Sequence, residues 1–216
     1  MMVERVCGLD EAGRGALAGP LVVAAVVMPK QFRFEDAIPP VRARDSKQLT
    51  SRQRLACYDA VLKLSNAIKI EVMSVTDINN CGINWANIEA FRRLISKIAA
   101  DEYIIDGRWN LPNLGAKARR TGCVVRADTY IPAVMAAGIV AKVRRDRIMY
   151  DLASVYPVYG WASNTGHGTA SHIGALRSYG SCEQHRLQFV STALGKSSEV
   201  TSKPANEDHF KTGQRA

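Results

Sequence analysis

The sequence predicts an α/β or α+β protein built around one mixed β-sheet with helices on its faces. Short apolar segments come early in the chain, and further ones alternate later with segments whose apolar residues recur at helical spacing. A mixed sheet covered by helices buries both kinds of apolar surface. The 216 residues are 47% hydrophobic and 23% charged, a balance that allows a real core and argues against disorder throughout.

Five segments are predicted to be strands. They are short, apolar and bounded by turn residues or charges, and they comprise residues 5–9, 20–28, 67–75, 103–106 and 123–127. Within 67–75, apolar and polar side chains alternate, as in a strand with one buried face.

Three longer stretches are predicted to be helices, beginning at Thr50 or Ser51 and covering 84–100 and 131–155. Thr50 or Ser51 can cap the first helix, and Pro132 is tolerated in the first turn of the third. Two short helices are expected near 171–179 and 183–194, after a glycine-rich loop at 159–168. We therefore expect one domain over residues 1–195, and a disordered tail over the polar residues 196–216.

Membrane and secretory classes are disfavoured. The longest apolar run, residues 21–28, is far shorter than the roughly 20 residues that span a bilayer. The N-terminus lacks the apolar core and cleavage site of a signal peptide. Five cysteines without a C-x-x-C pair indicate neither a zinc site nor a disulfide framework. The sequence therefore predicts a cytoplasmic protein that does not bind membranes.

The charge indicates a polyanionic partner. Lysine and arginine number 29 against 20 acidic residues, a formal net charge of +9. Residues 117–147 hold eight basic and two acidic side chains, which accounts for +6 of that excess. Phosphates attract such charge, so nucleic acid is the expected partner, and a merely solvated basic face is the alternative.

Two adjacent carboxylates, Asp10 and Glu11, end the first predicted strand and run into the glycine-rich segment Gly13-Arg14-Gly15. Carboxylates so close repel each other unless a positive group joins them, and Mg²⁺ or Mn²⁺ prefers such oxygen ligands. The glycines let backbone N–H groups approach an anion, and Arg14 adds a fork-shaped phosphate donor. A surface Asp-Glu pair in a turn is the alternative.

Two further carboxylates, Asp106 and Asp128, each follow a short apolar segment. Ligand and catalytic groups tend to collect where strands end at one edge of a sheet. Four carboxylates meeting there could hold one or two metal ions, which would clamp the attacking and leaving oxygens of a phosphodiester displacement. Beside a basic region, this pattern indicates a metal-dependent nuclease.

These segments resemble the type 2 ribonucleases H (ribonuclease HII). The matching blocks span residues 3–194 in the family's order: Gly8-Leu9-Asp10-Glu11-Ala12-Gly13-Arg14-Gly15 with Gly19-Pro20, Asp45-Ser46-Lys47-Gln48-Leu49, Ile105-Asp106-Gly107, Ala127-Asp128, the segment from Ala136 to Asp146, and Tyr159-Gly160-Trp161 through Gly168-Thr169 and His172.

The resemblance implies an α/β, ribonuclease H-like mixed sheet flanked by helices, with a C-terminal helical extension. It implies an endonuclease that cuts the RNA strand of RNA–DNA hybrids and cuts DNA-embedded ribonucleotides on their 5′ side, leaving 3′-hydroxyl and 5′-phosphate ends. We expect it to act as a monomer with Mn²⁺ or Mg²⁺. The metal-binding and catalytic set that the resemblance implies is Asp10, Glu11, Asp106 and Asp128.

The resemblance also implies substrate-binding residues. Gly13, Arg14 and Gly15 match the segment that grips the scissile phosphate and senses the 2′-hydroxyl, and Lys47 matches a basic residue near that phosphate. His167 departs from the family, which usually has a tyrosine in this Gly-Tyr-Gly-Thr block. We hypothesise that His167 takes the place of this tyrosine with weaker discrimination. A loop histidine without substrate contact is the alternative.

Three rival functions would differ from this one in sequence or in activity. Another nuclease or a recombinase on the same sheet would share the carboxylates but not the Gly13–Gly15 segment. A type 3 ribonuclease H would bring an extra N-terminal domain, for which the nine residues before Asp10 leave no room. A non-catalytic hybrid-binding module would bind its substrate without cutting it. His172 and His185, without a carboxylate nearby in sequence, are expected to be structural or solvated histidines rather than general bases.

Overall fold

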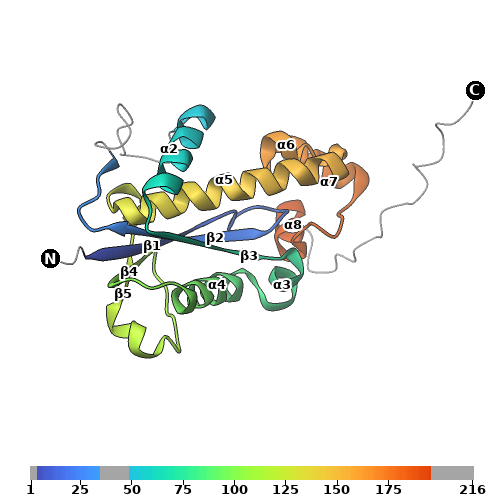
Figure 1. Cartoon of the computed structure of the whole chain (residues 1–216). Coiled ribbons are helices and arrows are strands. Elements are labelled where there is room, and N and C mark those ends of the chain that lie inside the picture. The colour runs from blue at the N-terminus through green and yellow to red at the C-terminus, as the bar shows by residue number, and fades with distance from the viewer. Residues whose placement is uncertain (1–3, 35–48, 196–216) are drawn as a thin grey trace, which may run out of the picture.

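The computed structural model describes residues 4–34 and 49–195 (Figure 1). Its sheet is mixed, as predicted. The antiparallel pairs are β1–β2 and β2–β3, and the parallel pairs are β1–β4 and β4–β5, in the order β3-β2-β1-β4-β5. The strands are β1 (Arg5–Ala12), β2 (Leu21–Pro29), β3 (Ala67–Met73), β4 (Glu102–Asp106) and β5 (Thr121–Val124).

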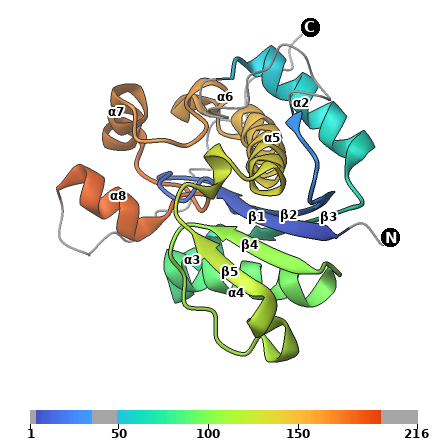
Figure 2. The same ribbon diagram turned by 90° about the vertical axis from the view of Figure 1, so that its left-hand side faces the viewer.

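Helices cover both faces of this sheet. Figure 2 shows α5 and α2 on one face, α3 and α4 on the other, and α7 and α8 at one end. None of the helices in the described ranges has the length and apolar character needed to span a membrane. The helices are α2 (Ser51–Leu64), α3 (Val75–Cys81), α4 (Ile83–Lys97), α5 (Pro132–Val155), α6 (Trp161–Asn164), α7 (Ala170–Tyr179) and α8 (Leu187–Leu194), with 3₁₀ turns η2 (Gly115–Arg120), η3 (Ala127–Thr129) and η4 (Pro157–Tyr159).

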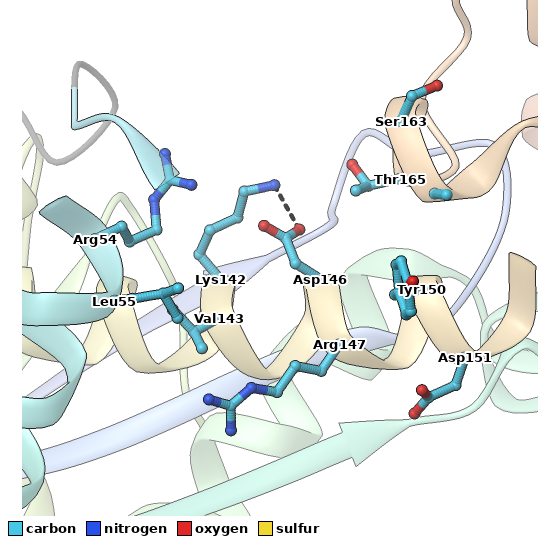
Figure 3. A pocket seen from close by; sticks show the side chains of 11 residues that line it. Arg54, Leu55, Lys142, Val143, Asp146, Arg147, Tyr150, Asp151, Ser163 and Thr165 are labelled. Atoms are coloured by element: carbon cyan, nitrogen blue, oxygen red, sulfur yellow. Dashed lines mark hydrogen bonds and ion pairs between the residues drawn. The ribbon is translucent and has the colours of Figure 1, made fainter. Parts of the chain in front are cut away.

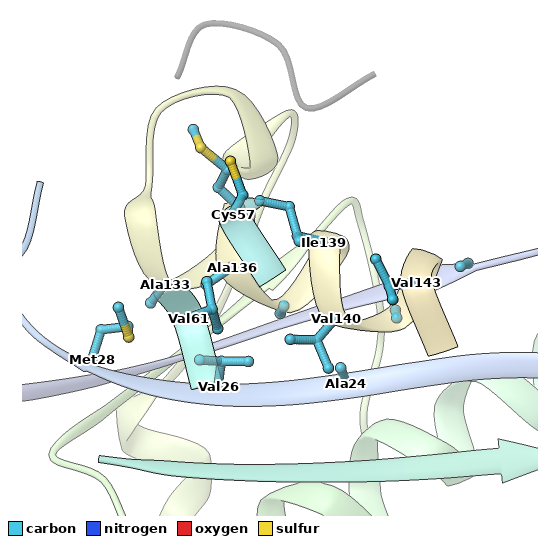
Figure 4. Packing of buried hydrophobic residues seen from close by; sticks show 14 of the residues in the cluster. Ala24, Val26, Met28, Cys57, Val61, Ala133, Ala136, Ile139, Val140 and Val143 are labelled. Carbon is cyan, nitrogen blue, oxygen red and sulfur yellow. The ribbon is translucent and has the colours of Figure 1, made fainter. Parts of the chain in front are cut away.

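Strand β2 explains the longest apolar run of the sequence. Successive side chains of a strand point to opposite faces, so a strand covered on both sides must be apolar throughout. Val22, Ala24, Val26 and Met28 join the core on the α5 side, which Figure 4 shows packed against α2 and α5. The intervening residues of β2 join the core on the α4 side.

The first turn of α5 packs directly on β1 because of Gly8. A Cβ atom at Gly8 would lie 2.1 Å from the backbone carbon of Ala133, a distance that no side chain tolerates. Only glycine therefore allows α5 to approach β1 so closely. This contact places the second turn of α5, with Gly138, beside Asp10 at the carboxyl end of β1.

The structure differs from the predicted elements in several places. Strand β1 extends to Ala12, beyond the predicted end at residue 9, and the last helix begins at Leu187 and not at residue 183. Helix α3 was not predicted, although the capping box that Ser74 forms with Asp77 is its start signal. Four residues of the predicted loop at 159–168 form α6. The strand predicted at 123–127 ends at Val124, because Arg126 adopts a left-handed φ of 58° that strand geometry excludes. Lys47 and the tail at 196–216 lie outside the described residues.

Candidate active site

Parallel pairing brings the predicted carboxylates to one edge of the sheet. Leu9 of β1 pairs with Ile105 of β4, so Asp10 and Asp106 each follow a residue of the same pair. The Asp106 Oδ1 atom accepts a hydrogen bond of 2.8 Å from the N–H of Ala127, which begins η3. Asp128 is the next residue and is buried. We name these four side chains the acidic cluster: Asp10, Glu11, Asp106 and Asp128.

The acidic cluster shares one electrostatic environment. Burial raises the pKa of Asp10 well above its ordinary value, and the negative charge of Glu11 raises it further. Asp106 and Asp128 act on the same pKa in the same direction, while the hydrogen bond of 2.7 Å from the Glu11 N–H opposes the rise. Burial also raises the pKa of Glu11 to about 7, against the lowering effect of the Arg14 charge. Carboxylates that repel each other through these charges need a cation to stay ionised together.

The donor set of the acidic cluster fits a hard divalent cation. The Glu11 Oε2 atom is buried and has no hydrogen-bond partner among the described residues, although a buried carboxylate oxygen normally has one. Carboxylate oxygens are the ligands that Mg²⁺ and Mn²⁺ prefer. In residues 4–34 and 49–195, however, no group of three or more His, Cys, Asp or Glu side chains is placed to hold a metal ion as it stands. Binding would therefore require these side chains to adjust.

Gly138 leaves room for Asp10. This glycine lies in α5, and a Cβ atom there would be 2.4 Å from the Asp10 Oδ2 atom. The Asp10 carboxylate thus occupies the space that a side chain at position 138 would fill. The backbone of α5 forms one wall of the acidic cluster.

Arg14 is held beside Glu11 by three residues that were not predicted to act here. Its two terminal nitrogens donate hydrogen bonds of 3.0 Å to Asn87 Oδ1 and 2.6 Å to Asn84 Oδ1, both on α4. Its guanidinium also lies 4.6 Å from the centre of the Trp109 ring, in cation–π geometry. The Trp109 indole N–H donates to the carbonyl of Asp106 at 2.7 Å, which links Arg14 to the acidic cluster. Asn84 and Asn87 lie at i and i+3 of α4, so the sequence places them on one face of a helix, but only the tertiary structure brings that face to the end of β1.

His167 follows Gly166 in the loop between α6 and α7 and is exposed. Its ring makes no hydrogen bond within the described residues. Partial desolvation and then the charge of Arg145 lower its pKa. His167 lies on a different segment from β1, β4 and η3, which carry the acidic cluster.

His172 and His185 hold the backbone of this loop. Both are fully buried, and their Nε2 atoms lie 3.1 Å apart. The Cys182 N–H donates to His185 Nδ1, so the proton of neutral His185 lies on Nε2 and points to His172. His172 then donates from Nδ1 to the carbonyl of His167 at 2.9 Å. These two histidines are structural, one of the two roles expected for them.

The basic segment 117–147 is not one surface. Lys117 donates to the carbonyls of Ile95 and Ile98 at the end of α4, at 2.6 and 2.9 Å. Arg145, one of the eight basic residues of this segment, is fully buried and so belongs neither to a phosphate-contacting surface nor to a solvated face. Lys142 pairs with Asp146 at 2.7 Å in a pocket of about 550 Å³ between α2, α5 and α6, shown in Figure 3. Arg54 and Arg147 also line this pocket, whereas Arg119, Arg120 and Arg126 are exposed on η2 and beside η3. The basic side chains that a nucleic-acid backbone can reach therefore lie on more than one part of the surface.

The chain is similar to known proteins over most of its length. The model of the family "Ribonuclease HII" matches residues 7–192. Ribonuclease HII of Thermosynechococcus vestitus is 40% identical over 192 residues, which cover 88% of this chain and 86% of that protein. The structure of ribonuclease H2 from Pyrococcus horikoshii has a TM-score of 0.71 at 23% identity, over 88% of this chain and 97% of that one. That of Bst-RNase HIII in complex with Mn²⁺ has a TM-score of 0.67 at 20% identity, over 89% and 70% of the two chains. The two structural likenesses support the fold.

Proposed function

Because the chain belongs to the ribonuclease HII family, endonucleases that cleave the RNA of RNA–DNA hybrids, we propose that the acidic cluster is its catalytic centre. The observation that carries this proposal is geometric: the pairing of β1 with β4 and the hydrogen bond from Ala127 to Asp106 bring Asp106 and Asp128, distant in the chain, to the end of β1. Both act on the pKa of Asp10 accordingly. The unpartnered Glu11 Oε2 atom supports it independently. In this role the acidic cluster would hold Mn²⁺ or Mg²⁺.

A divalent cation bound there would offset the charge of the carboxylates and stabilise negative charge that develops on the scissile phosphate. The protein's own part is to place the substrate. Arg14, fixed by Asn84 and Asn87, presents a guanidinium beside Glu11 to a phosphate. Gly15 is exposed, and a Cβ atom there would meet nothing within 4 Å, so a sugar-phosphate backbone can approach this segment closely.

We propose that the substrates are RNA–DNA hybrids and duplex DNA with embedded ribonucleotides. The cut falls on the 5′ side of the ribonucleotide and leaves 3′-hydroxyl and 5′-phosphate ends. Gly13, Arg14 and Gly15 contact the scissile phosphate and the 2′-hydroxyl, the group that distinguishes RNA from DNA. Lys47 is proposed to lie near the same phosphate. The monomeric state and the cytoplasmic location stay predictions from the sequence.

The decisive experiment compares Asp10→Asn with wild type on a long RNA–DNA hybrid and on a DNA duplex with one ribonucleotide, with cut positions mapped. We expect Asp10→Asn to abolish cutting in Mn²⁺ or Mg²⁺ while hybrid binding persists. Asp59→Asn, at an exposed acid on α2, is the matched control and should cut normally. A wild-type protein that binds the hybrid and stays inert with Mn²⁺ would favour the non-catalytic binding module.

His167 is proposed to occupy the place of the family's tyrosine at the RNA–DNA junction. A tyrosine ring offers a larger stacking area and a hydroxyl that donates and accepts hydrogen bonds. We expect His167→Tyr to raise the ratio of single-ribonucleotide to long-hybrid cleavage. An unchanged ratio would mean that His167 is a loop residue without substrate contact.

A further inference from the structure

Two buried arginines from the C-terminal half of the chain hold the segment that connects β1 with β2. Arg145 lies in α5 and Arg186 directly precedes α8, and both side chains are fully buried. The segment, residues 13–20, begins with the Gly13-Arg14-Gly15 motif. Its sequence distance from Arg186 reaches 173 residues.

Arg186 binds both ends of this segment. Its Nη1 atom donates to the carbonyls of Gly13 at 2.7 Å and Arg14 at 3.0 Å. Its Nε and Nη2 atoms donate to the carbonyl of Gly19 at 3.0 and 2.8 Å. One planar guanidinium thus fixes the orientation of three peptide groups, which a lysine ammonium cannot reproduce.

Arg145 supports the same segment from the other side of the loop. It donates to the carbonyls of Pro20 and Ala18, each at 3.0 Å, and to that of Thr165 at 2.9 Å. It also packs against Gly13, whose φ is +90° and where a Cβ atom would lie 1.8 Å from the Arg145 Nε atom. Gly13 is therefore required for the approach of Arg145.

Neither arginine forms an ion pair with a carboxylate within the described residues. Their hydrogen bonds all go to carbonyl oxygens, and Arg186 also lies 5.6 Å from the centre of the Phe189 ring. Burial lowers the pKa of Arg145 to about 10 and that of Arg186 to about 9. A buried charge without a counter-charge is costly. Packing alone therefore does not explain why arginine stands at these two positions.

The geometry of the peptide bond indicates what the hydrogen bonds from Arg186 achieve. In a trans peptide the C=O and the N–H point in opposite directions. The carbonyls of Gly13 and Arg14 point to Arg186, so the N–H groups of Arg14 and Gly15 point away from it. Within the part of the chain that the structure describes, no backbone or side-chain group accepts a hydrogen bond from either N–H. Two such N–H groups, side by side in a glycine-rich turn, form a site for an anion.

We infer that Arg186, supported by Arg145, is a positioning residue that orients the N–H groups of Arg14 and Gly15 to bind a phosphate of the substrate backbone. This inference rests on the proposed function, because it deepens the role of the Gly13–Gly15 segment. The guanidinium acts through the peptide groups and does not touch the phosphate itself.

The test combines a substitution in the protein with the neutralisation of single phosphates in the substrate, alone and together. Hybrids are made with one neutral methylphosphonate at each position flanking the cut, and kcat and KM are measured for wild type and Arg186→Lys. For wild type we expect one position where neutralising the phosphate raises KM by about tenfold to a hundredfold, the effect of losing hydrogen bonds to a charged group. Arg186→Lys should show a raised KM with the all-phosphate hybrid and little further effect of the methylphosphonate there. Arg177→Lys, at an exposed arginine of α7, is the matched control.

The outcomes separate the inference from the proposed function. If no flanking methylphosphonate affects wild type, the proposed phosphate contact of the segment is wrong. If wild type depends on one phosphate and a folded Arg186→Lys depends on it equally, the inference is wrong. Should Arg186→Lys not fold, Gly15→Pro decides, because it removes one of the two N–H groups at an exposed, open position and leaves both arginines in place. The inference requires that Gly15→Pro lose most of the phosphate dependence, and a folded Gly15→Pro that keeps it in full would overturn the inference.

Discussion

Substituting Gly138 by alanine tests whether the position of Asp10 controls activity. At an ordinary helical position this change stabilises a protein by about 0.5–1 kcal/mol, because glycine loses more backbone entropy on folding. Here the new Cβ atom would lie 2.4 Å from the Asp10 Oδ2 atom, whereas ordinary Cβ contacts are 3.4 Å or longer. The side chain that must retreat, by about 1 Å, is a carboxylate at the end of β1, and a displacement of that size costs on the order of a hundredfold in rate.

We therefore expect Gly138→Ala to fold with nearly unchanged stability and to lose about a hundredfold in single-turnover cleavage of an RNA–DNA hybrid. The Mn²⁺ concentration for half-maximal activity should rise as well, because the displaced carboxylate is a proposed metal ligand.

Gly174→Ala is the matched control, since Gly174 lies in α7 with no atom within 4 Å of its new Cβ. It should keep full activity and raise Tm by about 2–4 °C, the shift for 1 kcal/mol in a chain of this size. Full activity of Gly138→Ala, or a loss that merely follows unfolding, would refute the reasoning.

Two further predictions concern stability and substrate binding. Burial, and then the charge of His172, lower the pKa of His185 from 6.5 to about 4, so the unfolded chain binds a proton that the folded one resists. Stability should fall as the pH drops from about 6.5 to 4, by up to roughly 3 kcal/mol from this group. Urea unfolding should show that His185→Asn flattens this slope, and an unchanged slope would contradict it. Trp109→Ala removes the ring against which the Arg14 guanidinium lies and should lower kcat/KM about tenfold, a loss in the range of a cation–π contact. Trp85→Ala, on the exposed surface of α4, should leave kcat/KM unchanged. Equal losses of kcat/KM in the two variants would count against a role for Trp109.

The sequence predicted those parts of the site that depend on local order. Apolar segments followed at once by acids located Asp10, Glu11 and Asp106, because a strand end and the residue after it are adjacent in any fold. Asp128 was expected at a strand end and instead lies in η3, four residues beyond β5. A non-glycine residue with positive φ, Arg126, causes the difference, and sequence alone does not reveal such a conformation.

The parts that were not predicted depend on tertiary contacts. Arg145 and its neighbour Arg144 have the same side chain, yet only Arg145 is buried, because it faces the carbonyls of residues 18–20. Arg14 meets Asn84 and Asn87 of α4 and Trp109 from the segment after β4. These two parts of the chain lie near Arg14 only in the folded protein. Parallel pairing between β1 and β4, separated by nearly a hundred residues, decides that arrangement, and nothing in the local sequence encodes it.

The long sequence separation between Arg186 and the Gly13–Gly15 segment has a consequence for protein synthesis. All four acidic residues leave the ribosome in the first two thirds of the chain, whereas the guanidinium that holds the Gly13 and Arg14 carbonyls arrives 173 and 172 residues after them. A nascent chain can therefore form its sheet before the turn at residues 13–15 has its hydrogen bonds from Arg186. We expect a product of premature termination before residue 186 to retain every acidic group and to be a poor nuclease, measurable with a chain that stops at residue 180. The turn would thus be completed only after all four acidic residues have been synthesised.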